Sequence, residues 1–502
     1  MAYLLITGAT GFLGGYLLRD TLLARLPVAV LVRARTSESA RDRIECVMQS
    51  WETQLQRNLP RPIVVSGDLH ESGLELSSED RHWIASNCDA VLHSAASVSF
   101  HAESETGEPY RSNVEGTQNL LEFCREAGIR RFHHVSTAYV CGTCNGDVSE
   151  NNFSAEGPFG NDYEKSKARA EQLLREATFL DETTIFRPSI IVGDSQTGFA
   201  SGYHGIYTSL QLGYLYLLDK LRNGWRLDES LARQVVEESF VKQLGLVGTE
   251  RKNLVTVDWV SAAVVRILRA EKQPGQTYHL TNPKPVSITA LAEAMIAAVL
   301  ATVGESTNHK AGIPAALRES EGFREHMAVY RSYFRDDPVF DVKNTQRIAT
   351  ELPCPALDHE TLVKLWNYAL RADFVWRRPQ ISLPELDVAA RIEQLPEEVS
   401  QPDLQLEASG PGGGSWRIRF EGDHPVAVER GIDTGRATDV YATTNALSAI
   451  ANQEITIEQA VSSGRLVLFS DNLSNDAAIA MLRTMFEWLT TREPMAEAAA
   501  TS

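Results

Sequence analysis

The stretch that decides the fold is YLLITGATGFLGGYLL, residues 3–18. Its first five residues form an apolar run typical of a buried strand, and a helical pattern follows the glycines. Gly8, Gly11 and Gly14 lie between the two with the spacing G-x-x-G-x-x-G. The first glycine permits a tight turn, the second lets backbone N–H groups approach a pyrophosphate, and the third lets helix and strand pack closely. Because this turn opens a βαβ unit, it predicts dinucleotide binding.

Beyond this turn, short β-branched runs alternate with helical patterns as far as about residue 190. This alternation predicts an α/β fold, a doubly wound parallel Rossmann sheet with helices on both faces. Later residues are mostly helical, and then strands precede helices again. We expect a dinucleotide-binding Rossmann domain at 1–195, a mostly helical substrate-binding region at 196–395 with strands returning near 253–286, a linker rich in Pro, Gly, Ser and acidic residues at 396–414, an α+β domain at 415–492 and a disordered tail at 493–502.

Composition and charge exclude several classes of protein. The chain has 502 residues, 43% of them hydrophobic, and no apolar run reaches the ~20 residues of a membrane helix. A net charge of −18 argues against nucleic acid binding. The N-terminus lacks a basic region and its glycines interrupt the apolar run, so we expect mature protein rather than a signal peptide.

Cysteine usage predicts a reducing, cytoplasmic location, because six cysteines in so long a chain form no disulfide framework. Cys141 and Cys144 have C-x-x-C spacing. Without a second pair nearby, that spacing is interpreted as incidental, and no metal site is expected.

The end of the second predicted strand bears on the choice of dinucleotide. An acidic residue there would hold the ribose 2′-hydroxyl of NAD. The strand instead ends VLVRARTS, residues 30–37, with Arg33 and Arg35 and no acid at that point. Two guanidinium groups suit a 2′-phosphate by charge and by bidentate geometry, so we expect NADP(H). The alternative is that one or both arginines only face solvent.

A second informative stretch is GNDYEKSKARAEQLLREA, residues 160–177. This stretch contains a helical apolar stripe formed by Ala170, Leu173, Leu174 and Ala177. Followed backwards, the same helix face contains Lys167 and Tyr163. A lysine on a buried face is costly unless its charge is used. The alternative is a frayed first turn with the lysine extended to water.

Together these residues resemble the extended short-chain dehydrogenase/reductase superfamily over roughly residues 1–300. The matching motifs are the glycine turn, GDL at 67–69, HSAA at 93–96, Asn113 opening the next helix, STAYV at 136–140 and Tyr163-x-x-x-Lys167. LVRA, HSAASVSF, NVEGT, HVSTAYVCG and RPSIIVGDSQTG resemble a narrower group, the fatty acyl-CoA reductases and the thioester reductase domains of carboxylic acid reductases and peptide synthetases. This resemblance implies that NADPH reduces an acyl thioester to an aldehyde, sometimes onward to an alcohol.

The resemblance also implies residue roles. Tyr163 would act as general acid, Lys167 would lower the pKa of the tyrosine and bind nicotinamide ribose hydroxyls, and Thr137 would orient the carbonyl, with Ser136 as the adjacent alternative. The implied cofactor contacts are Gly8, Thr10, Gly11, Phe12, Leu13, Gly14, Arg33, Arg35, Asp68, Leu69, Ala95, Asn113, Ser136, Tyr163, Lys167, Pro188 and Ser189. Asn113 is alternatively, or additionally, a helix N-cap.

Substrate delivery and the C-terminal domain leave alternatives open. Because the chain starts directly at the first strand, we expect the acyl group to arrive as a CoA ester, on a separate carrier protein, or in another form. The aromatic stretch 202–225 predicts either an acyl pocket or ordinary core packing. Residues 415–492 resemble the sterol carrier protein type 2-like fold, which implies lipid binding; the alternative is a dimerisation or stability module, and the oligomeric state is open.

Other functions compatible with the same motifs are an alcohol or ketone dehydrogenase, an epimerase or dehydratase, and a lipid-carrier or NADPH-sensing protein without turnover.

Overall fold

The computed structural model of the protein describes residues 2–102, 104, 106–242, 245–270, 275–305, 328–384, 387–397, 403–422, 424–469 and 473–491. The chain divides into two compact units that interleave in sequence. The first unit contains Met1–Leu5, Thr21–Ser66 and Arg378–Ser502, and the second contains Ile6–Asp20 and Gly67–Arg377. The expected tail at 493–502 lies outside the described residues.

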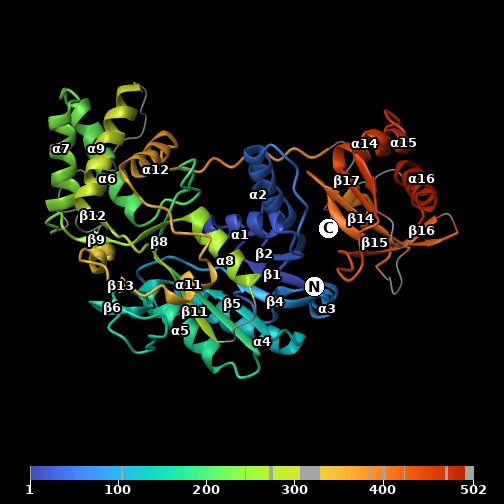
Figure 1. Ribbon diagram of the computed structural model, residues 1–502, viewed down its shortest axis with the longest axis horizontal. Coiled ribbons are helices and arrows are strands. Elements are labelled where there is room, and N and C mark those ends of the chain that lie inside the picture. The colour runs from blue at the N-terminus through green and yellow to red at the C-terminus, as the bar shows by residue number, and fades with distance from the viewer. Residues whose placement is uncertain are drawn as a thin grey trace, which may run out of the picture. The chain divides into compact units, whose positions relative to one another are not determined.

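A seven-stranded sheet in the order β11-β7-β5-β4-β1-β2-β3 confirms the predicted parallel α/β fold (Figure 1). Its strands are β1 (Tyr3–Thr7), β2 (Val28–Val32), β3 (Ile63–Ser66), β4 (Cys88–His93), β5 (Arg131–Val135), β7 (Glu182–Pro188) and β11 (Gln276–Leu280). Every residue of β1 and β2 is buried, as expected for strands covered on both faces. The strand order reverses between β1 and β4, the place where open α/β sheets bind ligands.

Helices cover both faces of this sheet. They are α1 (Phe12–Leu23), α2 (Ala40–Leu55), α3 (Ser78–Asn87), α4 (Gly116–Ala127) and α5 (Asp162–Glu176), with the short turns η1 (Ser72–Glu75), η2 (Arg111–Glu115) and η3 (Ala138–Cys141). In Figure 1, α4 and α5 lie on one side of the strands and α1 and α8 (Val257–Leu268) on the other.

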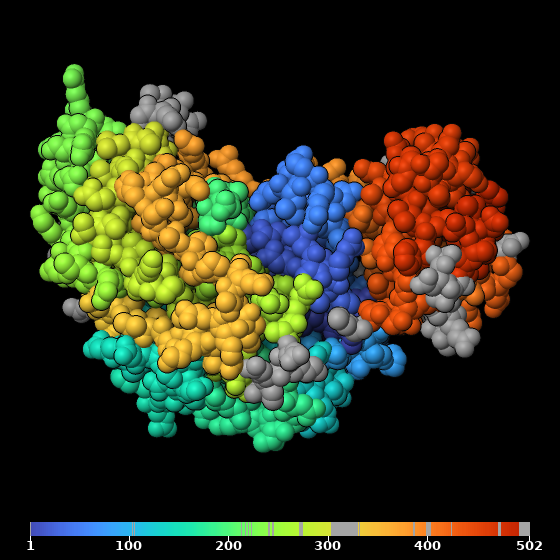
Figure 2. Space-filling model, viewed as in Figure 1, coloured from blue at the N-terminus to red at the C-terminus, as the bar shows by residue number. Residues whose placement is uncertain are grey.

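The region after residue 195 is mostly helical, as expected. It contains α6 (Ile206–Arg222), α7 (Glu229–Val236), η4 (Glu237–Lys242), α9 (Ile288–Glu305), η6 (Ala328–Tyr333), α11 (Lys343–Ile348) and α12 (His359–Arg371). Three strand pairs accompany these helices: β8 (Ile190–Val192) with β10 (Leu254–Thr256), β9 (Arg251–Lys252) with β12 (Val286–Ser287), and β6 (Asp147–Val148) with β13 (Val339–Phe340). Figure 2 shows α12 packed on α9 at the surface.

Residues Ile206–Arg222 of the aromatic stretch 202–225 form α6, and several of their large side chains are buried, whereas Trp225 is exposed. Tyr207, Tyr214 and Leu217 are buried in the same cluster as Trp366. A cavity that Tyr214 and Leu217 help to line has a volume of only 10 Å³. Core packing therefore accounts for the described buried side chains of this stretch, and this cavity is too small to hold an acyl chain.

The C-terminal part of the first unit is an α+β domain around a mixed sheet in the order β16-β15-β14-β17-β18. Its strands are β14 (Leu404–Ser409), β15 (Gly414–Glu421), β16 (His424–Arg430), β17 (Val440–Thr443) and β18 (Leu466–Leu468), and its helices are α13 (Val388–Ile392), α14 (Thr444–Ala451), α15 (Ile457–Ser462) and α16 (Asn475–Thr491).

The linker expected at 396–414 is wrong in part, because β14 lies inside it. Leu404, Leu406 and Ala408 are fully buried on one face of that strand. This alternation is short and is flanked by the Pro, Gly and Ser residues that suggested a linker. Residues 398–402 of the expected linker lie outside the described residues.

No helix in the described ranges has both the length and the apolar character needed to cross a membrane.

Candidate active site

The glycine turn between β1 and α1 has no room for side chains. Gly8 has a φ of 75°, and a Cβ added there would lie 2.5 Å from the backbone nitrogen of Ala95. A Cβ on Gly14 would lie 1.9 Å from the carbonyl oxygen of Gly8. The Gly11 N–H donates to that same carbonyl at 2.9 Å, which closes the turn. The result is a bare backbone cradle before a helix N-terminus, and it fits a dinucleotide pyrophosphate.

The other predicted cofactor contacts of the second unit lie at strand ends or in the turns that follow. Thr10 lies in the glycine turn, Phe12 and Leu13 open α1, Asp68 and Leu69 follow β3, Ala95 follows β4, Ser136 follows β5, Pro188 ends β7 and Ser189 follows it. The Ala95 N–H donates to the Thr7 hydroxyl at 3.3 Å. The Ser189 hydroxyl is buried and has no hydrogen-bond partner among the described residues, so it can accept a ligand contact.

Arg33 and Arg35 lie in the first unit, directly after β2, and both side chains are exposed. The Arg33 carbonyl accepts from the Arg43 guanidinium. Burial, and then repulsion from Arg35 and more weakly from Arg33, lowers the pKa of Arg43, so both exposed guanidinium groups lie near a third one.

Lys167 is buried, with 1% of its surface exposed, so the alternative of a lysine extended to water is wrong. Its Nζ donates to the Val135 carbonyl at 2.7 Å and lies 3.3 Å from Nε2 of His134. Burial lowers the pKa of Lys167 to about 7. The amine therefore lies at the carboxyl end of β5, directly before Ser136 and Thr137.

A polar chain connects Lys167 to the strand that carries the glycine turn. Nδ1 of His93 lies 2.7 Å from the Thr7 hydroxyl, and its ring lies 5.3 Å from the ring of His134. Burial lowers the pKa of His93 to about 3 and that of His134 well below its usual value, so both rings are neutral. The chain of contacts crosses β1, β4 and β5 to α5. Both histidines lie in motifs that carry the family resemblance, but no pattern in the sequence distinguishes them as functional residues.

Tyr163 lies in the first turn of α5, one turn before Lys167. The Asn161 side chain caps this helix by accepting from the Glu164 N–H at 2.9 Å. The Tyr163 ring packs edge-on against Phe100 at 5.8 Å between centroids. Burial, and then the neighbouring Glu164, raise the pKa of Tyr163 above its usual value.

Thr137 follows β5 and is buried. Its hydroxyl donates to the Pro188 carbonyl at 3.5 Å and accepts from the Tyr139 N–H at 3.3 Å. Among the residues described, no hydrogen bond joins the Tyr163 hydroxyl to Thr137 or Lys167. The structure thus brings Thr137 to Pro188 and Lys167 to the end of β5. Tyr163 lies one turn before Lys167 on the same helix, α5.

Asn113 does not cap a helix, which corrects one of its two expected roles. It lies inside η2, where Oδ1 accepts from the Ser97 N–H at 2.8 Å. Its Nδ2 donates to the Ser97 carbonyl and to the Ser166 hydroxyl, both at 2.9 Å. The side chain therefore fixes the loop after β4 to the residue beside Lys167.

A buried ion pair connects α5 to β7. The Arg187 guanidinium contacts the Glu171 carboxylate at 2.9 and 2.6 Å, and both side chains are fully buried. Burial alone would raise the pKa of Glu171, but Arg187 holds it below the usual value. Because Arg187 is in β7, the pair joins α5 to the strand that ends at Pro188.

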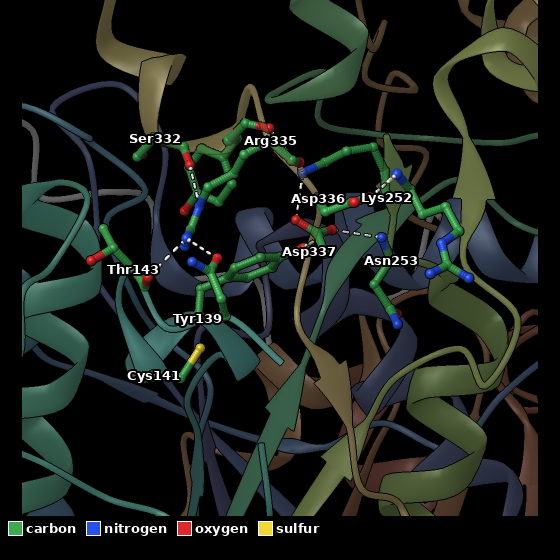
Figure 3. A network of polar contacts seen from close by, with 12 residues as sticks. Tyr139, Cys141, Thr143, Lys252, Asn253, Ser332, Arg335, Asp336 and Asp337 are labelled. Atoms are coloured by element: carbon green, nitrogen blue, oxygen red, sulfur yellow. Dashed lines mark hydrogen bonds and ion pairs between the residues drawn. The ribbon is translucent and has the colours of Figure 1, made fainter. Parts of the chain in front are cut away.

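Residues 328–341 form a strap across the loop that follows Thr137. Arg335 donates to the carbonyl oxygens of Gly142 at 3.1 Å and Thr143 at 2.8 Å (Figure 3). Asp337 accepts from the Tyr139 hydroxyl at 2.8 Å and pairs with Lys252. The strap thereby holds the turn η3. No signal in the sequence singled it out, because its partners lie far away along the chain.

A polar cleft of 780 Å³ opens beside the start of α5. Phe100, Asn161, Lys165 and Arg169 are among its lining residues. Because Phe100 also contacts the Tyr163 ring, the cleft leads toward the tyrosine. Cys141 does not line this cleft, and burial raises the pKa of its thiol to about 12, which makes it a poor nucleophile. No group of three metal-ligating side chains occurs in the described part of the chain.

A parallel sheet with a bare glycine turn at its reversal point, followed by a Tyr-x-x-x-Lys helix after the fifth strand, is the architecture of the extended short-chain dehydrogenases/reductases, and the chain has this fold. The chain belongs to the NAD-binding family described as male sterility protein, whose model matches residues 6–264, more than half of its length.

Two curated relatives and one solved structure show what the chain is similar to. It is 26% identical over 297 residues to nonribosomal peptide synthetase asaC of Aspergillus flavus, covering 56% of this chain and 26% of that protein. It is 32% identical over 221 residues to the L-2-aminoadipate reductase large subunit of Penicillium chrysogenum, covering 38% and 15%. The chain therefore spans about a quarter or less of these relatives.

The solved structure is the terminal R domain from the myxalamid PKS-NRPS biosynthetic pathway. It superimposes with a TM-score of 0.57 at 24% identity and covers 76% of this chain and 93% of that one. This likeness shows a shared fold.

Proposed function

We propose that the chain is an NADP(H)-dependent reductase of hydrophobic acyl thioesters, delivered as CoA esters or on a carrier protein and reduced to an aldehyde or alcohol. The observation that carries the proposal is the burial of Lys167 at the end of β5, one helical turn from Tyr163. A buried amine with a lowered pKa, next to a partly buried phenol and at the ligand edge of the sheet, is a proton-handling arrangement. The relatives named as a peptide synthetase and an aminoadipate reductase support the thioester substrate.

In this proposal Thr137, Tyr163 and Lys167 have different roles in the reaction at one carbonyl group. A reduced nicotinamide held at this edge of the sheet would supply the hydride for the thioester carbon. Thr137 and Tyr163 donate hydrogen bonds to the carbonyl oxygen, where negative charge develops. Tyr163 would then give its proton to that oxygen, and the carbon–sulfur bond would break as this hydroxyl proton passes to the departing sulfur, which releases the aldehyde and the thiol. Lys167, when charged, favours the phenolate and so offsets the burial that raises the pKa of Tyr163.

The glycine turn and the residues at the strand ends would hold the dinucleotide, and Arg33 with Arg35 would hold a 2′-phosphate. The polar cleft would admit the arm that carries the thioester in a CoA ester or on a carrier protein. Lys165 and Arg169 suit the phosphate of this arm, and the polar lining suits its amides. The acyl chain would then lie toward Phe100 and Tyr330, whose rings are 5.0 Å apart.

The lipid-carrier resemblance of residues 415–492 stays a prediction and part of the proposal: this domain would hold an acyl chain before or after reduction. Displacement of a fluorescent fatty acid by acyl-CoA tests it, and failure to bind any fatty acid would favour a module for stability or dimerisation.

The decisive experiment mixes purified protein with NADPH and a panel of acyl-CoAs and carbonyl compounds, and follows the loss of NADPH absorbance with product analysis. We expect oxidation with long-chain acyl-CoAs and an aldehyde or alcohol product. Oxidation of NADPH with ketones alone would mean that the chain is a ketone reductase and not a thioester reductase. Tightly held NAD(H) recycled without net oxidation would indicate an epimerase.

A matched pair of variants tests the acid. Tyr163→Phe should lower turnover by about 10²- to 10⁴-fold while the Kd for NADPH stays within about twofold. Tyr441→Phe, a tyrosine of β17 in the C-terminal domain, should change neither. Full activity of Tyr163→Phe would contradict the assignment.

A further inference from the structure

His134 of β5 is a fully buried histidine whose side chain has one hydrogen-bonding neighbour in the described part of the chain. Its Nε2 lies 3.3 Å from Nζ of Lys167, whereas its Nδ1 is buried without a hydrogen-bond partner there. A buried polar atom without a partner is destabilising, and an apolar side chain at this position would avoid that cost. The contact with the lysine is therefore the feature that this imidazole serves.

The fold fixes both sides of this contact. His134 lies opposite His93 in the register of β4 and β5, and the two rings are 5.3 Å apart. His93 is itself held by the Thr7 hydroxyl at 2.7 Å. On the other side, Nζ of Lys167 donates to the Val135 carbonyl at 2.7 Å. The packed ring and the strand carbonyl therefore define the position of the amine.

The amine and the ring can share a hydrogen in two ways. A charged amine has three N–H donors and no lone pair, so Nε2 must accept and the ring hydrogen must lie on Nδ1. A neutral amine can instead accept a hydrogen from Nε2, and Nδ1 is then an unpaired acceptor. The proposed reaction requires the charged amine and hence the first arrangement. That arrangement uses two of the three donors, on His134 and Val135, and leaves the third for a ligand.

The other titratable groups near the amine act on it from a distance. Burial lowers the pKa of Lys167, and the carboxylate of Glu171, one turn further along α5, raises it. That carboxylate is already paired with Arg187 of β7. His93 and Tyr163 are neutral near pH 7, because burial lowers the pKa of the histidine to about 3 and raises that of the tyrosine. The side-chain acceptor in direct contact with Nζ is instead the imidazole in β5.

We infer that His134 is a positioning residue for Lys167: its Nε2 accepts a hydrogen bond from the charged amine and so keeps the proton on that amine inside the fold. The same contact directs one N–H into the protein and leaves another for the ligand. The inference rests on the proposed role of Lys167 and deepens it. An acceptor of the same reach should replace the ring, whereas an apolar side chain or a shorter amide should not.

The test measures the pH at which Lys167 loses its proton in the folded full chain, by urea unfolding of paired variants between about pH 5 and pH 9. In each background the free energy of unfolding is compared with and without Lys167→Met, so that the titration of the other groups cancels. The difference between the pair is constant while the folded protein keeps the proton on the lysine. Above that pH it rises, because the unfolded chain still holds the proton.

In the wild type we expect this rise to begin at about pH 7. His134→Leu removes the acceptor and should move the onset down by at least about one pH unit, a tenfold loss of proton affinity. His134→Asn should do the same, because its shorter amide does not reach Nζ, and it serves as the test if the leucine variant fails to fold. His134→Gln, whose longer amide can accept at the reach of Nε2, should leave the onset within about 0.3 units.

His133→Leu is the matched control, since His133 is also buried in β5 but its side chain lies on the opposite face of the sheet. An unchanged onset in both His134→Leu and His134→Asn would overturn the inference. An equal shift in His133→Leu would also overturn it, because the effect would then be a general loosening of the strand. In turnover of NADPH with acyl-CoA, the fall of kcat at high pH should shift in the same pattern. Unfolding as expected without any turnover would leave the inference standing and remove the proposed reaction instead.

Discussion

The buried lysine should make the stability of the protein depend on pH. Burial lowers the pKa of Lys167 from 10.5 to about 7, a shift of about 3.5 units or about 5 kcal/mol. Between these two values the unfolded chain holds the proton and the folded chain does not. The free energy of unfolding therefore rises with pH in that window by up to about 1.4 kcal/mol per unit. Below about pH 7 both states are protonated, and the full burial cost remains.

Lys167→Met removes this dependence. We expect the variant to be the more stable protein at about pH 6, and its advantage over the wild type to shrink by about 2 kcal/mol between about pH 7 and pH 9. The assay is urea unfolding followed by tryptophan fluorescence at each pH. Lys165→Met, at a partly exposed lysine of the same helix, should show a constant difference from the wild type. A constant difference for Lys167→Met as well would mean that the amine stays charged in the folded protein, and would refute the reasoning.

Three further perturbations follow from named contacts. Glu171→Gln leaves the buried Arg187 without its carboxylate partner and should lower the free energy of unfolding by about 3–5 kcal/mol, measured by thermal unfolding. The double variant Glu171→Gln/Arg187→Met should regain part of this stability. Gly14→Ala forces a Cβ to within 1.9 Å of the Gly8 carbonyl and should weaken dinucleotide binding at least about tenfold by calorimetry, whereas Gly157→Ala, whose Cβ meets only the Phe159 side chain at 3.5 Å, should not. Arg335→Ala removes charged donors from the loop after Thr137 and should cost about 2–4 kcal/mol by calorimetric melting; an unchanged melting temperature would mean that the strap is not structural.

Features that depend on neighbours in sequence could be predicted from the sequence. The glycine turn is one in part: Gly14 is required by the carbonyl of Gly8 within the same turn, whereas Gly8 is required by the backbone of Ala95, which follows β4. The burial of Lys167 is another, because the stripe through Ala170 and Leu174 fixes which helix face is inside. The same local reasoning failed at β14, where a strand of six residues lay among turn-forming residues, and at Asn113, whose partners in the loop and in α5 no helix signal reveals.

Three contacts that no local pattern predicted involve buried titratable side chains. Glu171 with Arg187 and Lys252 with Asp337 are ion pairs whose members lie on different elements, and Lys167 of α5 lies beside the neutral ring of His134 in β5. Buried charge is destabilising unless it is paired, so it is retained where positioning or chemistry needs it. These three sites lie around the end of β5 and the turn η3: behind α5, beneath the strap, and at Lys167 itself. Glu171 and Lys167 lie on the same helix as Tyr163, and Asp337 accepts a hydrogen bond from Tyr139, two residues after Thr137, so these contacts position the elements on which the proposed reaction depends.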